Sequence, residues 1–158
     1  ERLKRAGARN AQVLDPGDTQ ELAGLEGKMD RVVVDAPCTG SGVWRRRPDA
    51  KWRLSPQMLE ARLAEQRAVL DQAAPLVKPG GRLAYITCSM LPPENRDQVE
   101  AFLSRFPQYS IVPWPDLWSA ASLSAAPPQS ADGSGKTLLM TPRTFGTDGF
   151  FVAVLKRT

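Results

Sequence analysis

The feature of this 158-residue chain that most restricts its fold is the run RVVVDA at residues 31–36. Three valines stand in succession, without the alternation of apolar and polar residues that a strand with one solvated face shows. Such a run is typical of a strand buried on both faces of a parallel sheet. Pro37, Gly40 and Gly42 follow and end the strand.

Helical and extended patterns alternate after this strand. Ser55 and Pro56 favour the start of an amphipathic helix over 55–77, which the KPGG segment at 78–81 is expected to end. RLAYITCS at 82–89 is predicted as a strand. Pro92 and Pro93 open a second helix whose apolar face holds Val99, Phe102, Leu103 and Phe106, and YSIVPW at 109–114 is predicted as a strand. This order predicts an α/β fold with a parallel sheet.

The remaining segments are read by composition and periodicity. Residues 1–8 resemble the last turns of a helix, and NAQVLD at 10–15 a short strand. The segment 115–136 is rich in Ser, Ala, Pro and Gly, which predicts an irregular loop. TLLMTP at 137–142 and GFFVAVLKR at 149–157 are predicted as strands joined by a turn. We expect one domain, or part of one.

Composition excludes several classes of protein. No apolar run approaches the roughly 20 residues that a membrane span requires, and the charged segment ERLKRAGARN lacks the apolar core of a signal peptide. The chain has two cysteines and no histidine. With no sign of a disulfide framework, we expect a reducing cytoplasm.

Positive charge is concentrated in the segment WRRRPDAKWR at 44–53. Five cations stand against Asp49, and the resulting net charge of +4 equals the formal charge of the whole chain. Basic residues between Trp44 and Trp52 suit contacts with a phosphate backbone and stacking on bases, although a solvated charge run is the plain alternative. The candidate RNA-binding residues are Arg45, Arg46, Arg47, Lys51 and Arg53.

Each cysteine lies just beyond a predicted strand. Because ligands collect at the carboxyl ends of parallel strands, Cys38 and Cys88 are expected to face one cleft. Two thiols without histidine lack the further ligands that a metal site needs and the usual base of a cysteine protease. A redox pair is more often a close Cys-x-x-Cys, and a buried apolar filler is the structural alternative for Cys88.

Five motifs in order resemble the RNA cytosine-C5 methyltransferases of the bacterial Sun/Fmu (RsmB-like) type within the Nop/Sun family. These motifs are DAPCTGSG, RRRPDAKW, KPGG, TCS and TDGFF. The resemblance covers nearly the whole chain outside 115–136. It implies a Rossmann-like S-adenosylmethionine-dependent methyltransferase fold, with 1–158 as the C-terminal part of the catalytic domain. It also implies methylation of carbon 5 of cytosine, with 16S ribosomal RNA a better fit than transfer RNA.

The resemblance assigns roles to three residues at the strand ends. Cys88 of TCS would be the nucleophile that adds to carbon 6, and Cys38 of DAPC would assist release of the methylated base. In the related DNA enzymes the cysteine after the proline is the nucleophile, so exchanged roles remain the internal alternative. Asp35 would contact N3 and the amine of the base, or cap the following turn.

The cofactor implied is S-adenosylmethionine, with Asp18, Asp35 and Pro37 as its contacts. Asp15 would take the place of Asp18 if the alignment with the family motif is shifted. The alternative is that Asp18 is an ordinary turn aspartate without a cofactor role. Lys51 occupies a position near the target nucleotide in the family. The first residues of the closing motif at 148–151 would line the base pocket, and its two phenylalanines fit an ordinary core position equally well.

Family members carry a glycine-rich turn and an acidic strand end before the point at which this chain starts. We therefore expect the fold to be incomplete at its N-terminus, with the first two sheet strands missing. The strand at 31–36 would then have an unpaired edge, satisfied by the missing N-terminal segment or by self-association. Cofactor binding and activity of this piece alone are expected to be weak.

Two other functions compete with this reading. Methyltransferases that act on exocyclic nitrogens share KPGG but use Asp-Pro-Pro-Tyr or Asn-Pro-Pro-Tyr, whereas this chain has DAPC and TCS. An RNA-binding or assembly module with the same fold and no activity is the non-enzymatic alternative.

Overall fold

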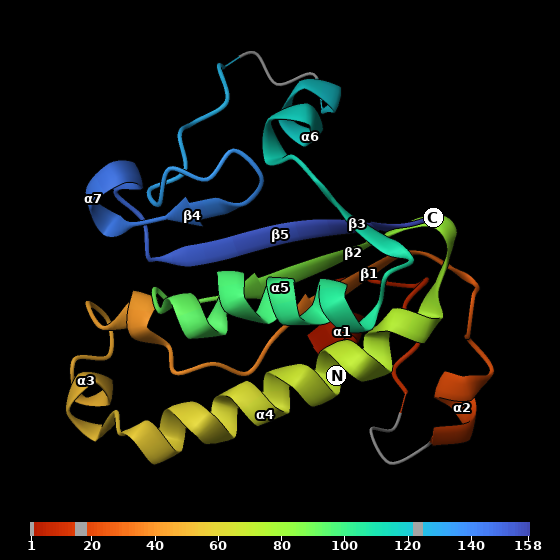
Figure 1. Ribbon diagram of the computed structural model, residues 1–158. Coiled ribbons are helices and arrows are strands. Elements are labelled where there is room, and N and C mark those ends of the chain that lie inside the picture. Colours follow the sequence, from red (N-terminus) through yellow and green to blue (C-terminus); the bar gives the residue numbers. More distant parts are fainter. Residues whose placement is uncertain (1, 15–18, 122–124) are drawn as a thin grey trace.

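The computed structural model describes residues 2–14, 19–121 and 125–158 and contains a five-stranded mixed sheet (Figure 1). The sheet order is β1-β2-β5-β3, and β4 also pairs with β5. The strands are β1 (Met29–Asp35), β2 (Val77–Thr87), β3 (Tyr109–Val112), β4 (Leu138–Met140) and β5 (Phe150–Arg157). The helices are α1 (Arg2–Arg5), α2 (Thr19–Ala23), α3 (Asp49–Arg53), α4 (Pro56–Ala73), α5 (Arg96–Arg105), α6 (Trp114–Ala120) and α7 (Pro142–Phe145), with short 3₁₀ turns at Ser41–Val43 (η1), Ala74–Leu76 (η2) and Pro92–Glu94 (η3).

The predicted α/β class is confirmed, and the sheet combines both strand directions. Strands β1 and β2 are parallel, and α4 lies between them in the chain. Strand β5 is antiparallel to β2, and both β3 and β4 are antiparallel to β5. The last strand of the chain is therefore inserted between β2 and β3, which run in the same direction. Helices α4 and α5 lie together on one side of the sheet, while α6 lies on the other side (Figure 1).

The core fills the space between the sheet and the pair α4 and α5. Strand β5 alternates, with Phe151, Ala153 and Leu155 buried, because successive side chains point to opposite faces of a strand. Two buried tyrosines keep their hydroxyls satisfied, since Tyr85 donates to the Glu94 carbonyl at 2.6 Å and Tyr109 to the Ala74 carbonyl at 2.7 Å.

The second face of β1 differs from the sequence prediction. Val34 is 4% exposed, but its neighbour Val33 is 66% exposed. No described helix packs over Val33, so the expectation that the run is buried on both faces is wrong for the described residues. Strand β1 also pairs only with β2 among those residues, which leaves its other edge unpaired.

The helix at 56 ends earlier than its periodicity predicts. Helix α4 stops at Ala73, and Pro75 lies in the 3₁₀ turn that follows, because proline lacks the N–H that another helical turn requires. KPGG is therefore not the helix stop. It lies within β2, whose pairing with β1 shifts register next to this segment, and Gly80 adopts a φ of 78° there.

Three further expectations change. Residues 10–14 form no strand, and Asp15 lies outside the described residues. Part of the predicted loop 115–136 is helical, because Pro115 at the first turn allows α6 to start at Trp114. The predicted strand 137–142 is shorter, since Thr141 caps α7 with its side chain and so ends β4 at Met140. None of the described helices is long and apolar enough to cross a membrane.

The prediction that Ser55 caps the start of α4 can be tested by mutation. The Ser55 hydroxyl accepts the Met58 N–H at 3.2 Å, as an N-cap should. We expect Ser55→Ala to lower the free energy of unfolding by about 1 kcal/mol, measured by urea denaturation. Ser104→Ala is the control, because that hydroxyl only donates to the Glu100 carbonyl within an exposed part of α5. Equal losses in the two variants would contradict the cap.

Candidate active site at the ends of β1 and β2

The two cysteines lie side by side at the carboxyl ends of the parallel strands. Asp35 is in register with Ile86, and the Ala36 N–H donates to the Ile86 carbonyl at 2.9 Å. This pairing places the loops that follow the two strands next to each other. The Sγ atoms of Cys38 and Cys88 are 3.3 Å apart, and both side chains are half-buried. Cys88 is therefore not an interior filler.

A third segment closes against these loops through glycine backbones. The Gly42 N–H donates to the Cys88 carbonyl, and the Gly149 N–H donates to the Gly42 carbonyl, both at 2.9 Å. A Cβ on Gly42 would lie 2.4 Å from the Gly149 carbonyl oxygen and 2.8 Å from that of Cys88. The closing motif TDGFF is thus brought to the cysteines, although Phe151 itself is buried in the core.

The loops after β1 and β2 are also held by hydrogen bonds from buried polar residues that the sequence did not predict as part of the site. The Gln66 side chain donates to the Pro37 carbonyl at 2.9 Å, and Glu94 accepts hydrogen bonds from the loops after both strands. The Ser41 hydroxyl lies 3.1 Å from that of Ser89. Gln66 carried a signal, because it stands on the apolar stripe of α4 between Leu63 and Leu70, where a buried polar group needs a partner.

The thiol pair has unequal acidity. A hydrogen bond from Cys38 lowers the pKa of the Cys88 thiol to about 7, against partial burial and the negative charges of Asp35 and Glu94, which act to raise it. The hydrogen bond to Cys88 and burial raise the pKa of Cys38. A thiolate is the nucleophilic form of cysteine, so this arrangement favours Cys88 as the reactive sulfur near neutral pH.

The predicted cofactor contacts are only partly described. Asp35 ends β1 with an exposed carboxylate that makes no hydrogen bond to the described residues. Pro37 is half-buried, and Gln66 occupies its carbonyl. Asp18 lies outside the described residues. An unpartnered carboxylate beside two thiols fits the donor groups of a nucleoside or a base.

The basic segment is anchored near the site by its arginines. Arg46 forms an ion pair with Asp148, and Arg45 lies 3.7 Å from the other oxygen of that carboxylate. Arg53 pairs with Asp49 at 2.6 Å. Arg47 is exposed and has no side-chain partner among the described residues.

Lys51 lies between two indoles in the same segment. Its Nζ is 5.8 Å from the centre of the Trp44 ring and 5.4 Å from that of Trp52. Trp52 is 82% exposed. A cation and a free aromatic face are therefore presented together, which is the combination that binds single-stranded nucleic acid.

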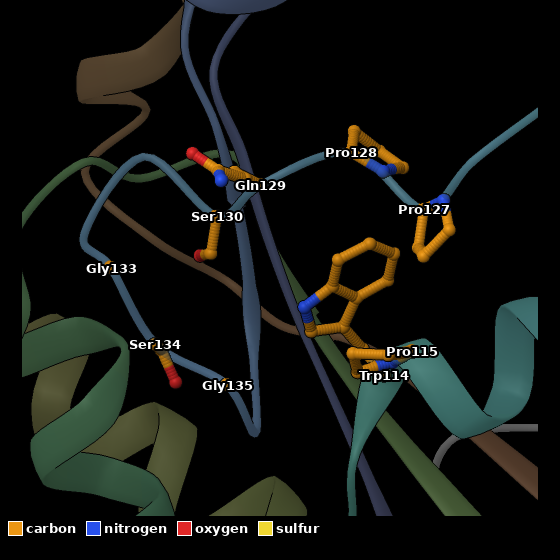
Figure 2. Close-up of a pocket in the computed structure, with 9 residues that line it drawn as sticks. All are labelled: Trp114, Pro115, Pro127, Pro128, Gln129, Ser130, Gly133, Ser134 and Gly135. Atoms are coloured by element: carbon orange, nitrogen blue, oxygen red, sulfur yellow. The ribbon is translucent and has the colours of Figure 1, made fainter.

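Other parts of the described chain offer less chemistry. A hollow of about 420 Å³ lies beside α6, where Figure 2 shows the Trp114 indole next to Pro127 and Pro128. Its lining contains no titratable residue. Within residues 2–14, 19–121 and 125–158, no group of three His, Cys, Asp or Glu side chains is placed to hold a metal ion.

Comparison with solved structures identifies the fold. The chain is similar to NSun6 from Pyrococcus horikoshii, solved with SFG, with a TM-score of 0.76 and 28% identity over 98% of this chain and 36% of that one. The mixed sheet, with its parallel β1–β2 pair and its antiparallel last strand, is part of a Rossmann-like S-adenosylmethionine-dependent methyltransferase fold.

The sequence comparisons are more specific. The family model described as 16S rRNA methyltransferase RsmB/F matches residues 1–156. Probable ribosomal RNA small subunit methyltransferase B of Bacillus subtilis is 42% identical over 132 residues, and that of a Synechocystis strain is 37% identical over 131. The chain belongs to the RsmB/F methyltransferase family. Each alignment covers 82% of this chain but only 28% and 27%, respectively, of these relatives.

The thiol hydrogen bond predicts the pH dependence of alkylation. Iodoacetamide should modify Cys88 at a rate that rises through about pH 7, because the thiolate fraction rises as pH passes the pKa. In Cys38→Ala the donor is lost and the pKa of Cys88 rises. The rate at pH 7 should then fall about tenfold.

Cys38→Ser is the matched control for this measurement, since the serine hydroxyl retains a hydrogen-bond donor. The alkylation rate of Cys88 at pH 7 should fall less in this variant than in Cys38→Ala. An unchanged profile in Cys38→Ala would show that the neighbouring thiol does not set the acidity of Cys88.

Proposed function

We propose that the protein containing this chain methylates carbon 5 of a cytosine in RNA, most specifically 16S ribosomal RNA, through a covalent bond between Cys88 and carbon 6. The observation that carries this proposal is the pair of thiols 3.3 Å apart at the ends of β1 and β2, with Cys88 as the more acidic member. The family description and the ribosomal RNA methyltransferases among the relatives support the substrate class.

The chemistry requires a sulfur nucleophile because carbon 5 of cytosine is a weak nucleophile. Addition of the Cys88 thiolate to carbon 6 forms an S–C6 bond and moves an electron pair toward carbon 5. S-adenosylmethionine would supply the methyl group that carbon 5 accepts and would leave as S-adenosylhomocysteine. Loss of the carbon 5 proton to a base then returns an electron pair to the ring, and the S–C6 bond breaks to regenerate the thiolate.

Cys38 fits the release step rather than the attack. Its raised pKa keeps it a thiol while Cys88 is ionised, so it stabilises the nucleophile by donating a hydrogen bond. When Cys88 is bonded to the base, Cys38 still lies beside the S–C6 bond that has to break. The Cys88 thiolate is consumed in that bond, which removes the hydrogen bond that is the main cause of the raised pKa of Cys38. Cys38 can then ionise, accept the carbon 5 proton and so free the enzyme.

Asp35 and Pro37 complete the proposed pocket. The exposed carboxyl group of Asp35 is suited to accept a hydrogen bond from the amine of cytosine and to share a proton with N3, where negative charge develops as sulfur adds. Asp35 and Pro37 are also the described residues that we propose contact the cofactor, together with Asp18. The base must leave its stack to reach the sulfur, so the target is single-stranded or flipped.

RNA is proposed to approach across the segment 44–53. Arg47 and the Lys51–Trp52 pair are the groups free to contact phosphates and bases, whereas Arg45, Arg46 and Arg53 are engaged in ion pairs. The ion pairs with Asp148 tie this segment to the glycine contact beside Cys88. Bound RNA would therefore lie against the same surface that opens on the thiols.

The roles of the two cysteines are tested with RNA of ordinary cytosine and the intact gene product. Cys38→Ala should accumulate a covalent protein–RNA adduct, because Cys88 still attacks, although more slowly, while release is blocked. Cys88→Ala should form none. Denaturing gel electrophoresis with labelled RNA detects the adduct. Adduct in Cys88→Ala alone would exchange the roles, and none in either variant would favour a binding module.

The RNA surface is tested by salt dependence. Arg47→Ala should weaken binding to a single-stranded oligonucleotide and reduce the slope of log K against log salt by about one. Fluorescence anisotropy at several salt concentrations measures both effects. Arg82→Ala is the control, because this exposed arginine lies midway along β2, six residues before Cys88 and outside the segment 44–53. Equal losses in both variants would mean that net charge alone governs binding.

A further inference from the structure

Glu94 is a fully buried carboxylate held by hydrogen bonds. Its exposed fraction is 0%, and no Lys or Arg of the described residues forms an ion pair with it. Four donors surround it instead. Oε1 accepts from the Thr39 N–H at 2.8 Å and from Gln66 Nε2 at 3.0 Å, and Oε2 accepts from the hydroxyls of Thr39, at 2.5 Å, and Ser89. An environment made only of donors suits a carboxylate, whose two oxygens both accept.

The donors belong to both cysteine loops. Thr39 directly follows Cys38, and Ser89 directly follows Cys88. Gln66 extends the connection, since its amide also donates to the Pro37 carbonyl on the other side of Cys38. One carboxylate, from η3, therefore accepts hydrogen bonds from the residue that follows each cysteine.

We propose that Glu94 is a positioning residue that keeps the Cys38 and Cys88 sulfurs within hydrogen-bond distance. The proposal rests on the role of Cys88 as nucleophile, because that role is what makes the thiol separation matter. The Cys38 donor favours the thiolate only while the two loops stay in this arrangement. The carboxylate acts through loop geometry and does not touch the reacting atoms.

The length of the Glu94 side chain and its negative charge have opposite expected effects on the pKa of Cys88, so they can be tested separately. The negative charge of Glu94 acts against ionisation of Cys88, in the same sense as that of Asp35. Cys38 and Tyr85 are the other titratable groups facing this cluster, and both are uncharged at neutral pH because their pKa values are raised. If the charge alone mattered, its removal would make Cys88 more acidic. A positioning role requires the length of the side chain instead.

Two substitutions distinguish these roles. Glu94→Asp keeps the charge but shortens the side chain by one carbon, about 1.5 Å, so it cannot reach both loops. Glu94→Gln keeps the length. The Thr39 N–H and the Gln66 amide only donate, which directs the new amide oxygen toward them. Its NH₂ then faces the hydroxyls of Thr39 and Ser89, which can turn and accept.

The experiment follows iodoacetamide labelling of the whole chain between pH 5.5 and 9, without RNA or cofactor. Trypsin separates Cys88, in residues 83–96, from Cys38, in residues 32–45, so mass spectrometry reports each thiol. In Glu94→Asp the midpoint for Cys88 should rise and its rate at pH 7 should fall about tenfold. In Glu94→Gln the midpoint should stay at or below that of the wild type.

A wild-type midpoint in folded Glu94→Asp, or an equal rise in both variants, would overturn the proposal. Circular dichroism establishes that each variant is folded. If Glu94→Asp does not fold, Thr39→Val removes one hydroxyl bond and keeps the N–H bond and the shape. It should raise the midpoint relative to Thr137→Val, whose hydroxyl contacts Ser134 instead. Equal midpoints there would also overturn the proposal. Labelling needs no methyl transfer, so its outcome is independent of the proposed reaction.

Discussion

The parallel pairing of β1 with β2 is the constraint on which the site depends. Asp35 is held opposite Ile86, so Cys38 and Cys88 leave the sheet three and two residues later on adjacent strands. A slip of one residue would turn each side chain to the opposite face of its strand. The core enforces this register, because Val34, Leu83 and Tyr85 must all face α4 and α5.

Opposing electrostatic effects meet at Cys88. Asp35, Glu94 and partial burial all disfavour a thiolate, and the hydrogen bond from Cys38 outweighs them. The acidity of the site therefore comes from a neutral donor at short range rather than from the cations of the segment 44–53. Apart from Arg47, those cations face Asp148, Asp49 and the indoles, and the two ion pairs with Asp148 secure the segment beside the glycine contact. We infer that the chain separates the tuning of its nucleophile from the attraction of its substrate.

The sequence predicted what depends on local chemistry and chain order. Strand, helix and strand in succession bring the cysteines together, and Ser55 caps α4 as its position indicated. KPGG was assigned wrongly, because Pro75 ends the helix first and pairing with β1 recruits the glycines into a strand. Glu94 was missed since its partners Gln66 and Thr39 lie 28 and 55 residues away. Such a cluster is visible only once the loops are placed in space.

The central claim is that the sulfur of Cys88 bonds to carbon 6 of the target cytosine. Its most direct test is to incubate the intact gene product with S-adenosylmethionine and RNA carrying 5-fluorocytosine, whose fluorine blocks release. Tandem mass spectrometry of the digested complex then locates the cross-linked residue. The account predicts a nucleotide attached to Cys88 in the peptide 83–96. Attachment to Cys38 in the peptide 32–45 would contradict it.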